Sequence, residues 1–245
     1  MIPKVLHYCW FGGGEKSPLI KDCLESWKLH LPEYQIIEWN ETNSDLRLPF
    51  VKKAYRQQKW AFVADYIRLK VLYEQGGIYL DTDMLLLQPL DSLLCNTTFL
   101  GAECKTFINC SIIGTTPHSN FIQKCMSEYG SIKITKKTDW GTITIPRIVT
   151  RVFKQMYGLD VPLDTISTTE QITIYPAAYF YPLQYQDKTD AANYKQYLRP
   201  ESFAVHLWSS SWIDSEALVP APPKRSFKDL FRIIKTIFVQ KNESV

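Results

Sequence analysis

In the middle of this chain, a helical segment is followed by two glycines and then by an apolar strand that ends in two aspartates. Residues 50–75 have the apolar spacing of a helix, with a break near Lys59. Gly76-Gly77 is typical of a helix end. Ile78-Tyr79-Leu80 predicts a short strand that leads directly into Asp81-Thr82-Asp83. This order indicates an α/β unit with an acidic strand end.

The N-terminal quarter repeats the alternation of strands and helices. Residues 2–11 and 34–39 read as strands, and residues 17–31 have helical spacing. Further strands are predicted at 84–87, 95–102, 108–113, 172–175 and 204–207, and further helices at 119–129 and 145–156. The pattern favours an α/β fold, a sheet flanked by helices.

Charge is unevenly distributed in an otherwise ordinary globular composition. The 245 residues are 45% apolar and 22% charged, which excludes disordered and fibrous classes. Residues 224–245 carry six basic and two acidic side chains, a net +4, and leave residues 1–223 at −1. The body is therefore not expected to bind nucleic acid, and attraction to phosphate-rich partners is assigned to the tail.

The C-terminal tail is separated from the rest by a proline-rich segment. We expect a globular domain over residues 1–218, a stiff linker over 219–223 and an amphipathic helix over 224–245. Its basic face contains Lys228, Arg232 and Lys235. Such a helix either lies on an anionic membrane surface or packs on the body, and the sequence leaves both open.

Export and membrane signals are not found in this sequence. No apolar run reaches the roughly 18 residues needed to span a bilayer, and residues 1–7 lack a signal-peptide core. The six cysteines show neither CxxC pairs nor metal-finger spacing. We therefore expect reduced thiols in a cytoplasmic protein.

The two aspartates of the strand end have the chemistry of a metal site. In an extended segment Asp81 and Asp83 project to the same face, where they repel each other unless a cation lies nearby. Mg²⁺ and Mn²⁺ prefer such oxygen ligands, and Mn²⁺ also accepts an imidazole such as His206. The alternatives are a solvated turn for the aspartates and a hydrogen-bonded structural histidine.

Asp65 and Arg68 add a polar pair to the preceding helix. They lie three residues apart on one face of an otherwise apolar stripe. Their position just before the acidic strand end favours a pair that faces a ligand. The alternative is a surface ion pair of little energetic weight.

Three sequence blocks carry a resemblance to a known family. Ala64-Asp65-x-x-Arg68 followed by Tyr79 and Asp81-x-Asp83 resembles the DXD-containing sugar-binding region of glycosyltransferase family 32. That family includes yeast-type initiating α-1,6-mannosyltransferases and bacterial capsule and lipopolysaccharide enzymes, and the spacing is similar to that of large clostridial glucosylating toxins. Residues 2–12 resemble its first strand and donor loop, and Val205-His206 with Ser211-Trp212 resembles its closing element.

The resemblance implies an activity and a location. It implies a Rossmann-like GT-A fold and a retaining transfer of a hexose or N-acetylhexosamine from a nucleotide sugar, with UDP favoured and Mn²⁺ or Mg²⁺ as cofactor. The acceptor would be a saccharide or lipid-linked saccharide in polysaccharide or lipopolysaccharide biosynthesis. The enzyme would be cytoplasmic, or peripheral on the inner face of the cytoplasmic membrane.

The resemblance also assigns roles to single residues. Asp65, Arg68, Asp81 and Asp83 would be catalytic; Asp81, Asp83 and His206 would bind the metal; and Tyr8, Trp10, Phe11, Gly12, Tyr79, Asn109, Ser211 and Trp212 would join Asp65, Arg68 and Asp81 around the donor. No back-face nucleophile is assigned, and His7 is interpreted as structural.

Two other functions compete with this interpretation. A phosphatase-like DxDxT site is disfavoured because Leu85 stands where that motif has Thr. A non-catalytic module that binds a nucleotide sugar or saccharide remains an alternative.

Overall fold

The structure is a computed structural model and describes residues 1–158 and 162–209. These residues belong to one compact unit, Met1–Ser210. The predicted domain end at 218, the linker 219–223, the helix 224–245 and the donor residues Ser211 and Trp212 lie outside the described residues.

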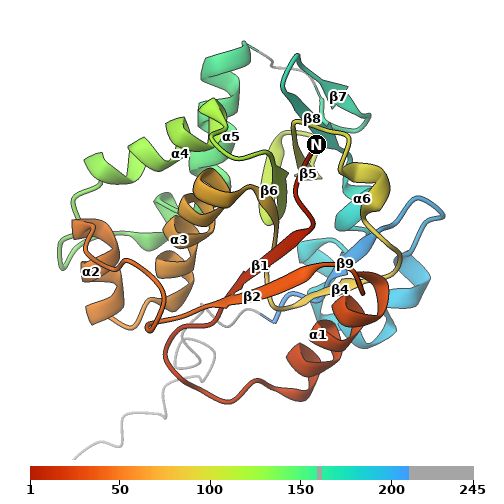
Figure 1. Cartoon of the computed structure of the whole chain (residues 1–245), viewed down its shortest axis with the longest axis horizontal. Helices are drawn as coiled ribbons and strands as arrows, with labels where there is room; N and C mark the ends of the chain where they lie inside the picture. Colours follow the sequence, from red (N-terminus) through yellow and green to blue (C-terminus); the bar gives the residue numbers. More distant parts are fainter. Residues whose placement is uncertain (159–161, 210–245) are drawn as a thin grey trace, which may run out of the picture. The chain divides into compact units, whose positions relative to one another are not determined.

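A mixed seven-stranded sheet forms the centre of this unit (Figure 1). Its order is β2-β1-β3-β6-β5-β8-β7. β1 runs parallel to both β2 and β3, and β6 is antiparallel to β3 and β5. The strands are β1 (Val5–Cys9), β2 (Gln35–Trp39), β3 (Gly77–Leu80), β5 (Thr98–Cys104), β6 (Phe107–Thr115), β7 (Ser167–Thr168) and β8 (Ile172–Tyr175).

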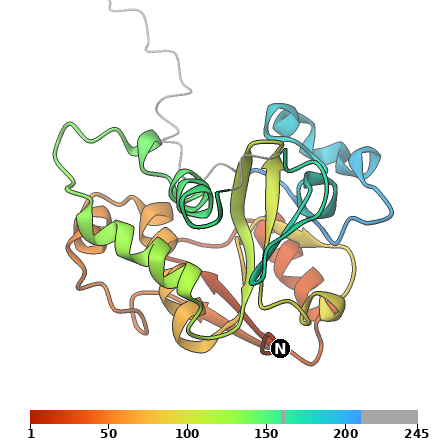
Figure 2. The ribbon, with the colours of Figure 1, turned by 90° about the horizontal axis from the view of Figure 1, so that it is seen from above.

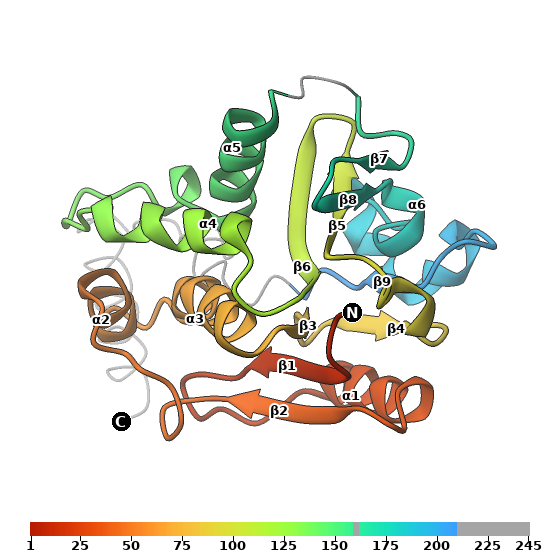
Figure 3. The same cartoon turned by 45° about the horizontal axis from the view of Figure 1, so that its top comes forward.

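Helices cover both faces of the sheet. They are α1 (Pro18–His30), α2 (Pro49–Arg56), α3 (Trp60–Gln75), α4 (Asn120–Ser131), α5 (Ile145–Tyr157) and α6 (Ala177–Phe180). The break predicted near Lys59 is confirmed, because α2 ends at Arg56 and α3 begins at Trp60. Figures 1 and 3 show α2–α5 on one side of the sheet and α1 and α6 on the other.

Each face has its own apolar core. The larger core packs α2, α3, α4 and α5 against the sheet and includes buried Phe50, Ile67 and Phe153. The second contains Trp27 from α1, which is fully buried and donates its indole N–H to the carbonyl of Met84 at 2.7 Å. The mixed α/β architecture expected from the alternation of helices and strands is confirmed.

The glycine pair makes the turn from α3 into β3 possible. Gly76 ends α3, with its N–H bonded to the carbonyl of Leu72. Gly77 has φ +95°, and a Cβ there would lie 2.5 Å from the carbonyl oxygen of Val5. Only glycine allows β3 to approach β1 this closely with a positive φ.

The strand predicted over 84–87 is present, but it does not belong to the central sheet. β4 (Met84–Leu86) does not continue the central sheet but pairs with β9 (Ala204–His206) in a separate antiparallel ribbon. Strand-to-strand pairing over such a sequence distance leaves no local signal. The 3₁₀ segments Asp91–Leu93, Trp140–Thr142 and Tyr185–Tyr197 were also not predicted.

Candidate active site

The candidate site lies where the strand order of the sheet changes direction. From β1 the chain passes to β2 on one side and then returns to β3 on the other side of β1. Because all three strands are parallel, the residues after β1 and after β3 emerge at the same edge. Such a switch point is the usual place for ligands in an α/β sheet. Trp10 follows β1 there, and Asp81 follows β3.

Asp81 and Asp83 converge through a turn, not through an extended strand. Met84 N donates to the carbonyl of Asp81 at 3.0 Å, which closes a tight turn around Thr82. The extended geometry predicted for this segment is therefore wrong, although both carboxylates still reach the same place. Asp83 is buried, whereas the side chain of Asp81 is 26% exposed.

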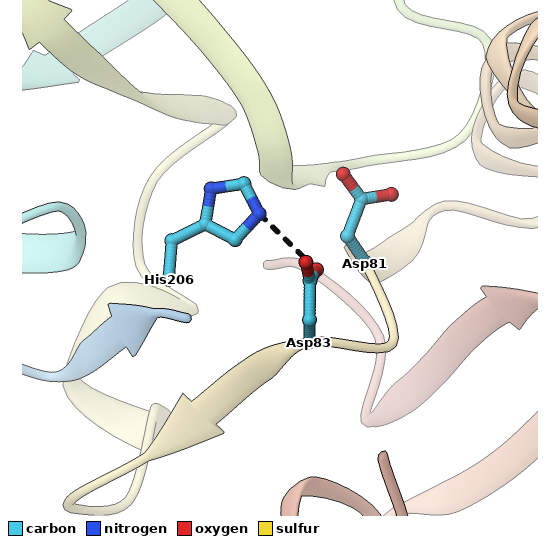
Figure 4. Close-up of side chains that lie close together, drawn as sticks. All are labelled: Asp81, Asp83 and His206. Carbon is cyan, nitrogen blue, oxygen red and sulfur yellow. Dashed lines mark hydrogen bonds and ion pairs between the residues drawn. The ribbon is translucent and has the colours of Figure 1, made fainter. Parts of the chain in front are cut away.

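His206 and Ser209 hold the buried carboxylate of Asp83. His206 Nε2 lies 3.1 Å from Asp83 Oδ1 (Figure 4). Ser209 donates both its backbone N–H and its hydroxyl to Asp83 Oδ2, at 2.8 and 2.9 Å. Burial opposes ionisation, but His206 and the Ser209 donors outweigh it and hold the pKa of Asp83 below its usual range. Asp83 is thus kept as a carboxylate.

Arg68 links helix α3 to the acidic turn. Its NH2 lies 3.1 Å from Oδ1 of Asp65 and 3.1 Å from Oδ1 of Asp81, and its NH1 donates to the carbonyl of Cys110 at 2.7 Å. The guanidinium also lies 4.5 Å from the ring centre of Tyr79. Burial disfavours the charge, but Asp81, Tyr79 and Asp65 together raise the pKa of Arg68 well above its ordinary value.

Tyr79 completes the positioning of Asp81. Its hydroxyl donates to Asp81 Oδ1 at 3.0 Å, the same oxygen that faces Arg68. Asp81 Oδ2 has no hydrogen bond or ion pair to any residue that the structure describes. One oxygen of Asp81 is therefore fixed, and the other remains available to a ligand.

Asp65 is the buried carboxyl behind this pair. Its Oδ2 accepts the backbone N–H of Ile145 at the start of α5, at 3.3 Å. Burial raises the pKa of Asp65 to about 7, although Arg68 opposes the rise. Asp65 and Arg68 form a buried ion pair, which rules out the alternative of a solvated surface bridge. That this pair faces a ligand stays a prediction.

A bulge in β6 lines the floor of the site. Leu100 pairs with Ile113 but Gly101 pairs with Asn109, so residues 110–112 face no partner on β5. The bulge presents the Ser111 carbonyl to the N–H of Asp81 at 2.8 Å. Bulges commonly re-aim groups next to active sites.

Asn109 is the last paired residue before that bulge. Its Oδ1 accepts the Ser111 N–H at 2.8 Å, and its Nδ2 donates to Glu103 Oε2 at 2.8 Å. Ser111 Oγ in turn lies 3.5 Å from His206 Nδ1. Asn109 is buried and holds the backbone of the bulge in shape.

Aromatic side chains form the other side of the site after β1. Trp10 is half-buried and donates its indole N–H to the carbonyl of Gly14 at 2.8 Å, with Lys16 Nζ lying 5.1 Å from the ring centre. Tyr8 donates to Glu38 Oε2 at 2.6 Å, and Glu38 also pairs with Lys16 at 2.8 Å.

Phe11 and Gly12 follow at the same edge. The side chain of Phe11 is buried in the larger core. Gly12 has φ +89°, and a Cβ there would meet the indole of Trp60 at 2.7 Å. Trp10, Phe11 and Gly12 therefore lie at the edge where β1 ends, with Phe11 directed inward, whereas Tyr8 lies within β1. Their role in donor binding stays a prediction.

The donor set fits a hard divalent cation. One ligand atom from each of Asp81, Asp83 and His206 can be chosen so that all lie within 4.8 Å of one another (Figure 4). Two carboxylates and an imidazole suit Mn²⁺, and the carboxylates alone suit Mg²⁺. These residues come from segments more than 120 positions apart, so their convergence is a property of the fold.

Several residues of the site were not predicted from the sequence. Trp208 and Ser209 lie two and three residues after His206, and the centre of the Trp208 ring lies 3.9 Å from that of His206. Proximity to His206 was a signal that could have identified both. Ser111 and Glu103 offered none, because only the bulge brings them in. His7 is confirmed as structural, fully buried between Trp39 and Gly76.

Two family models match consecutive parts of the chain. The model described as "Glycosyltransferase sugar-binding region containing DXD motif" matches residues 17–100, and that described as "Alpha 1,4-glycosyltransferase conserved region" matches residues 114–233. The first contains the acidic turn and the second contains His206.

Over these two parts the chain is similar to glycosyltransferases, and its acidic turn lies in the part that matches the DXD-containing model.

The curated relatives of this chain have names that mention different sugars and lipids. It is 28% identical over 155 residues to human lactosylceramide 4-alpha-galactosyltransferase, covering 60% of this chain and 41% of the relative. It is 25% identical to human alpha-1,4-N-acetylglucosaminyltransferase, covering 68% and 48%. It is 28% identical to a mannosyl phosphorylinositol ceramide synthase of Saccharomyces cerevisiae, covering 63% and 43%. The chain thus spans less than half the length of these relatives.

Two solved structures have a fold similar to that of this chain. The PaToxG glycosyltransferase matches with a TM-score of 0.52 and 19% identity over 64% of this chain and 70% of that chain. Apo GlyE of Streptococcus pneumoniae matches with a TM-score of 0.50 and 14% identity over 84% and 55%. Both are glycosyltransferases, and the likeness supports the expected GT-A type of fold.

Among the helices that the structure describes, none has the length and hydrophobicity of a membrane-spanning segment.

Proposed function

We propose that this protein is a retaining, metal-dependent glycosyltransferase. It transfers a hexose or N-acetylhexosamine from a nucleotide sugar, with UDP favoured, to a saccharide or glycolipid in polysaccharide or lipopolysaccharide biosynthesis. The observation that carries the proposal is the convergence of Asp81, Asp83 and His206 at the switch point of the sheet. The buried Arg68–Asp65 pair stands directly behind this group.

Each residue of the site has a distinct part in this reaction. Asp81, Asp83 and His206 would hold the metal, which as a Lewis acid supports the charge that develops on the diphosphate leaving group. Arg68 and Tyr79 fix Asp81 Oδ1 and leave Oδ2 for a ligand. Ser209 orients Asp83 through two hydrogen bonds. Preorganised groups of this kind do not have to reorganise during the reaction.

Arg68 and Asp65 would also meet the donor sugar. A buried, permanently charged guanidinium gives a rigid set of donors for sugar hydroxyls or phosphate oxygens. Trp10, with Lys16 at its ring, would provide the surface on which the nucleobase packs. Asn109 would support the acceptor side through the β6 bulge.

The acceptor is proposed to include glycolipids. Two of the relatives carry a ceramide lipid in their names. The basic sequence 224–245 would bring the enzyme to an anionic membrane surface, on the inner face of a cytoplasmic membrane.

A donor panel tests the proposal directly. UDP- and GDP-sugars are incubated with the full chain, with and without Mn²⁺, and release of nucleoside diphosphate is measured. We expect Mn²⁺-dependent hydrolysis of at least one UDP-sugar. Calorimetry with UDP and Mn²⁺ separates binding from turnover. Binding without hydrolysis or transfer for any donor would favour a non-catalytic binding module.

A further inference from the structure

An open hollow of about 590 Å³ lies between α5 and the tip of the β5–β6 hairpin. Helix α5 contributes Arg147, Thr150, Arg151 and Lys154, and the hairpin contributes Thr106 and Phe107. Figure 2 shows α5 (green) beside the upper end of the hairpin (yellow-green). The Ile108 N–H donates to Thr150 Oγ1 at 3.0 Å and joins the two walls. None of these residues belongs to the candidate metal site formed by Asp81, Asp83 and His206.

Three basic side chains of α5 line the hollow. Arg147, Arg151 and Lys154 recur at i, i+4 and i+7, so they share one face of α5, and all three are exposed. Arg151 NH2 donates to Glu128 Oε2 at 2.6 Å. Arg147 has no hydrogen bond or ion pair to any residue within 1–158 and 162–209. Three basic side chains thus line the hollow, and Arg147 is the one of them to which we assign the main contact with a bound anion.

Hydroxyl groups accompany these cations. Thr150 Oγ1 accepts a backbone N–H, and its own hydrogen has no acceptor in the described part of the chain. Thr106 is exposed at the hairpin tip. A guanidinium together with neighbouring hydroxyl donors is the typical chemistry of phosphate recognition.

The hollow is adjacent to the site but separate from it. Arg147 lies two residues after Ile145, whose N–H bonds to Asp65, and Phe107 lies two residues before Asn109. At the rise per residue of a helix and a strand, each separation is roughly 3–7 Å along the element. The hollow is therefore carried by the same two elements, α5 and β6, that contact the site through Ile145 and Asn109.

We propose that this hollow binds a phosphate group carried by the acceptor. This inference rests on the proposed function, because that function assigns the donor diphosphate to the metal site of Asp81, Asp83 and His206 and leaves the hollow for the acceptor. The phosphate belongs either to a saccharide phosphate or to a lipid headgroup, and both present the same oxygens to Arg147 and Lys154.

The test compares two double variants of the full chain that remove the same charge. Arg147→Gln/Lys154→Gln empties the hollow of two cations, and Lys124→Gln/Lys133→Gln changes two exposed lysines on α4 and after it. Two measurements follow turnover: donor hydrolysis without acceptor, and transfer to glucose, galactose and N-acetylglucosamine, each offered free and as the 1-phosphate. Two others follow binding: calorimetry with galactose 1-phosphate, and sedimentation with phosphatidylcholine vesicles that either contain or lack phosphatidylinositol.

We expect donor hydrolysis and thermal unfolding to be unchanged in both variants. The kcat/KM preference for phosphorylated over free acceptors falls about tenfold or more in Arg147→Gln/Lys154→Gln, because the phosphate loses charged hydrogen-bond donors. The control variant keeps the preference. Loss confined to phosphatidylinositol vesicles instead assigns the phosphate to a lipid headgroup.

Equal behaviour of the two variants in the transfer, calorimetric and vesicle measurements would overturn the inference. Calorimetry and vesicle binding do not require turnover. If the wild type hydrolyses no donor, the proposed enzymatic function fails, while these two measurements still decide whether the hollow binds phosphate.

Discussion

Arg68 and Asp81 form a 3.1 Å ion pair that joins helix α3 to the acidic end of β3. Arg68 is 4% exposed, and it also contacts Asp65 and the Cys110 carbonyl. The ion pair therefore connects the helix, the acidic turn and the β6 bulge. Disturbing it should affect both stability and catalysis.

Arg68→Met should destabilise the fold and abolish transfer. Removal of one member of a buried ion pair costs about 3–5 kcal/mol, because the remaining carboxylates lose their counter-charge. Denaturant unfolding measures the loss. Combining Arg68→Met with Asp65→Asn should cost less than the sum of the single changes, since one stranded carboxylate is removed as well. Strict additivity would contradict this coupling.

Asp83→Asn should leave the protein folded and remove Mn²⁺-dependent donor hydrolysis. The amide preserves the size of the side chain, but it loses the negative charge that a divalent ion requires. We expect a fall of about 100-fold or more in activity, because changing groups that only support metal ligands already costs about 10–100-fold. Asp22→Asn on the exposed face of α1 is the matched control. Wild-type activity with unchanged Mn²⁺ dependence would refute the metal assignment.

His7 should make the protein less stable in mild acid. Trp39 Nε1 can only donate, so His7 Nδ1 accepts at 3.0 Å and Nε2–H donates to the Gly76 carbonyl at 2.9 Å. Burial lowers the pKa of His7 from 6.5, although the Gly76 bond opposes the shift. Below pH 6.5 the unfolded chain binds a proton that the folded chain does not, so stability falls.

Unfolding in urea between pH 5 and 8 checks this expectation. His7→Gln should lower stability overall and flatten its pH dependence in this window. His30→Gln, at the end of α1, is the control and should keep the wild-type slope. An unchanged slope in His7→Gln would show that another group causes the acid sensitivity.

Gly12→Ala should impair donor binding more than Gly13→Ala does. Both glycines have positive φ, +89° and +66°, so an alanine is strained at either position. Only at Gly12 would the new Cβ meet Trp60, at 2.7 Å, whereas nothing lies within 4 Å at Gly13. The difference in donor KM between the variants measures that contact. Equal values would mean that Trp60 yields freely.

Deletion of residues 224–245 should release the protein from anionic vesicles. The segment carries a net +4, and each basic residue near an anionic surface contributes about 1 kcal/mol. Flotation with phosphatidylglycerol vesicles, compared with phosphatidylcholine alone, measures the effect. Unchanged binding of the shortened chain would show that the tail does not attach it to the membrane.

Local sequence patterns were sufficient to predict most helices and strands, and also the acidic motif and the Asp65–Arg68 pair of the site. The helix break near Lys59, the strand 78–80 and the pairing of Asp65 with Arg68 depend on residues close in sequence. Apolar periodicity and helical spacing record such contacts directly. The sequence by itself thus determined the class of fold, the acidic motif and the residues that resemble a sugar-binding region.

The tertiary structure decided how these parts combine. Pairing of β4 with β9 places His206 against Asp83, 123 residues away, and the β6 bulge brings Ser111 to the same point. It also decided that Asp81 and Asp83 meet in a turn and that Arg147 and Lys154 share a hollow with the hairpin. These arrangements depend on strand register and long-range packing, for which residues adjacent in the chain carry no periodic signal.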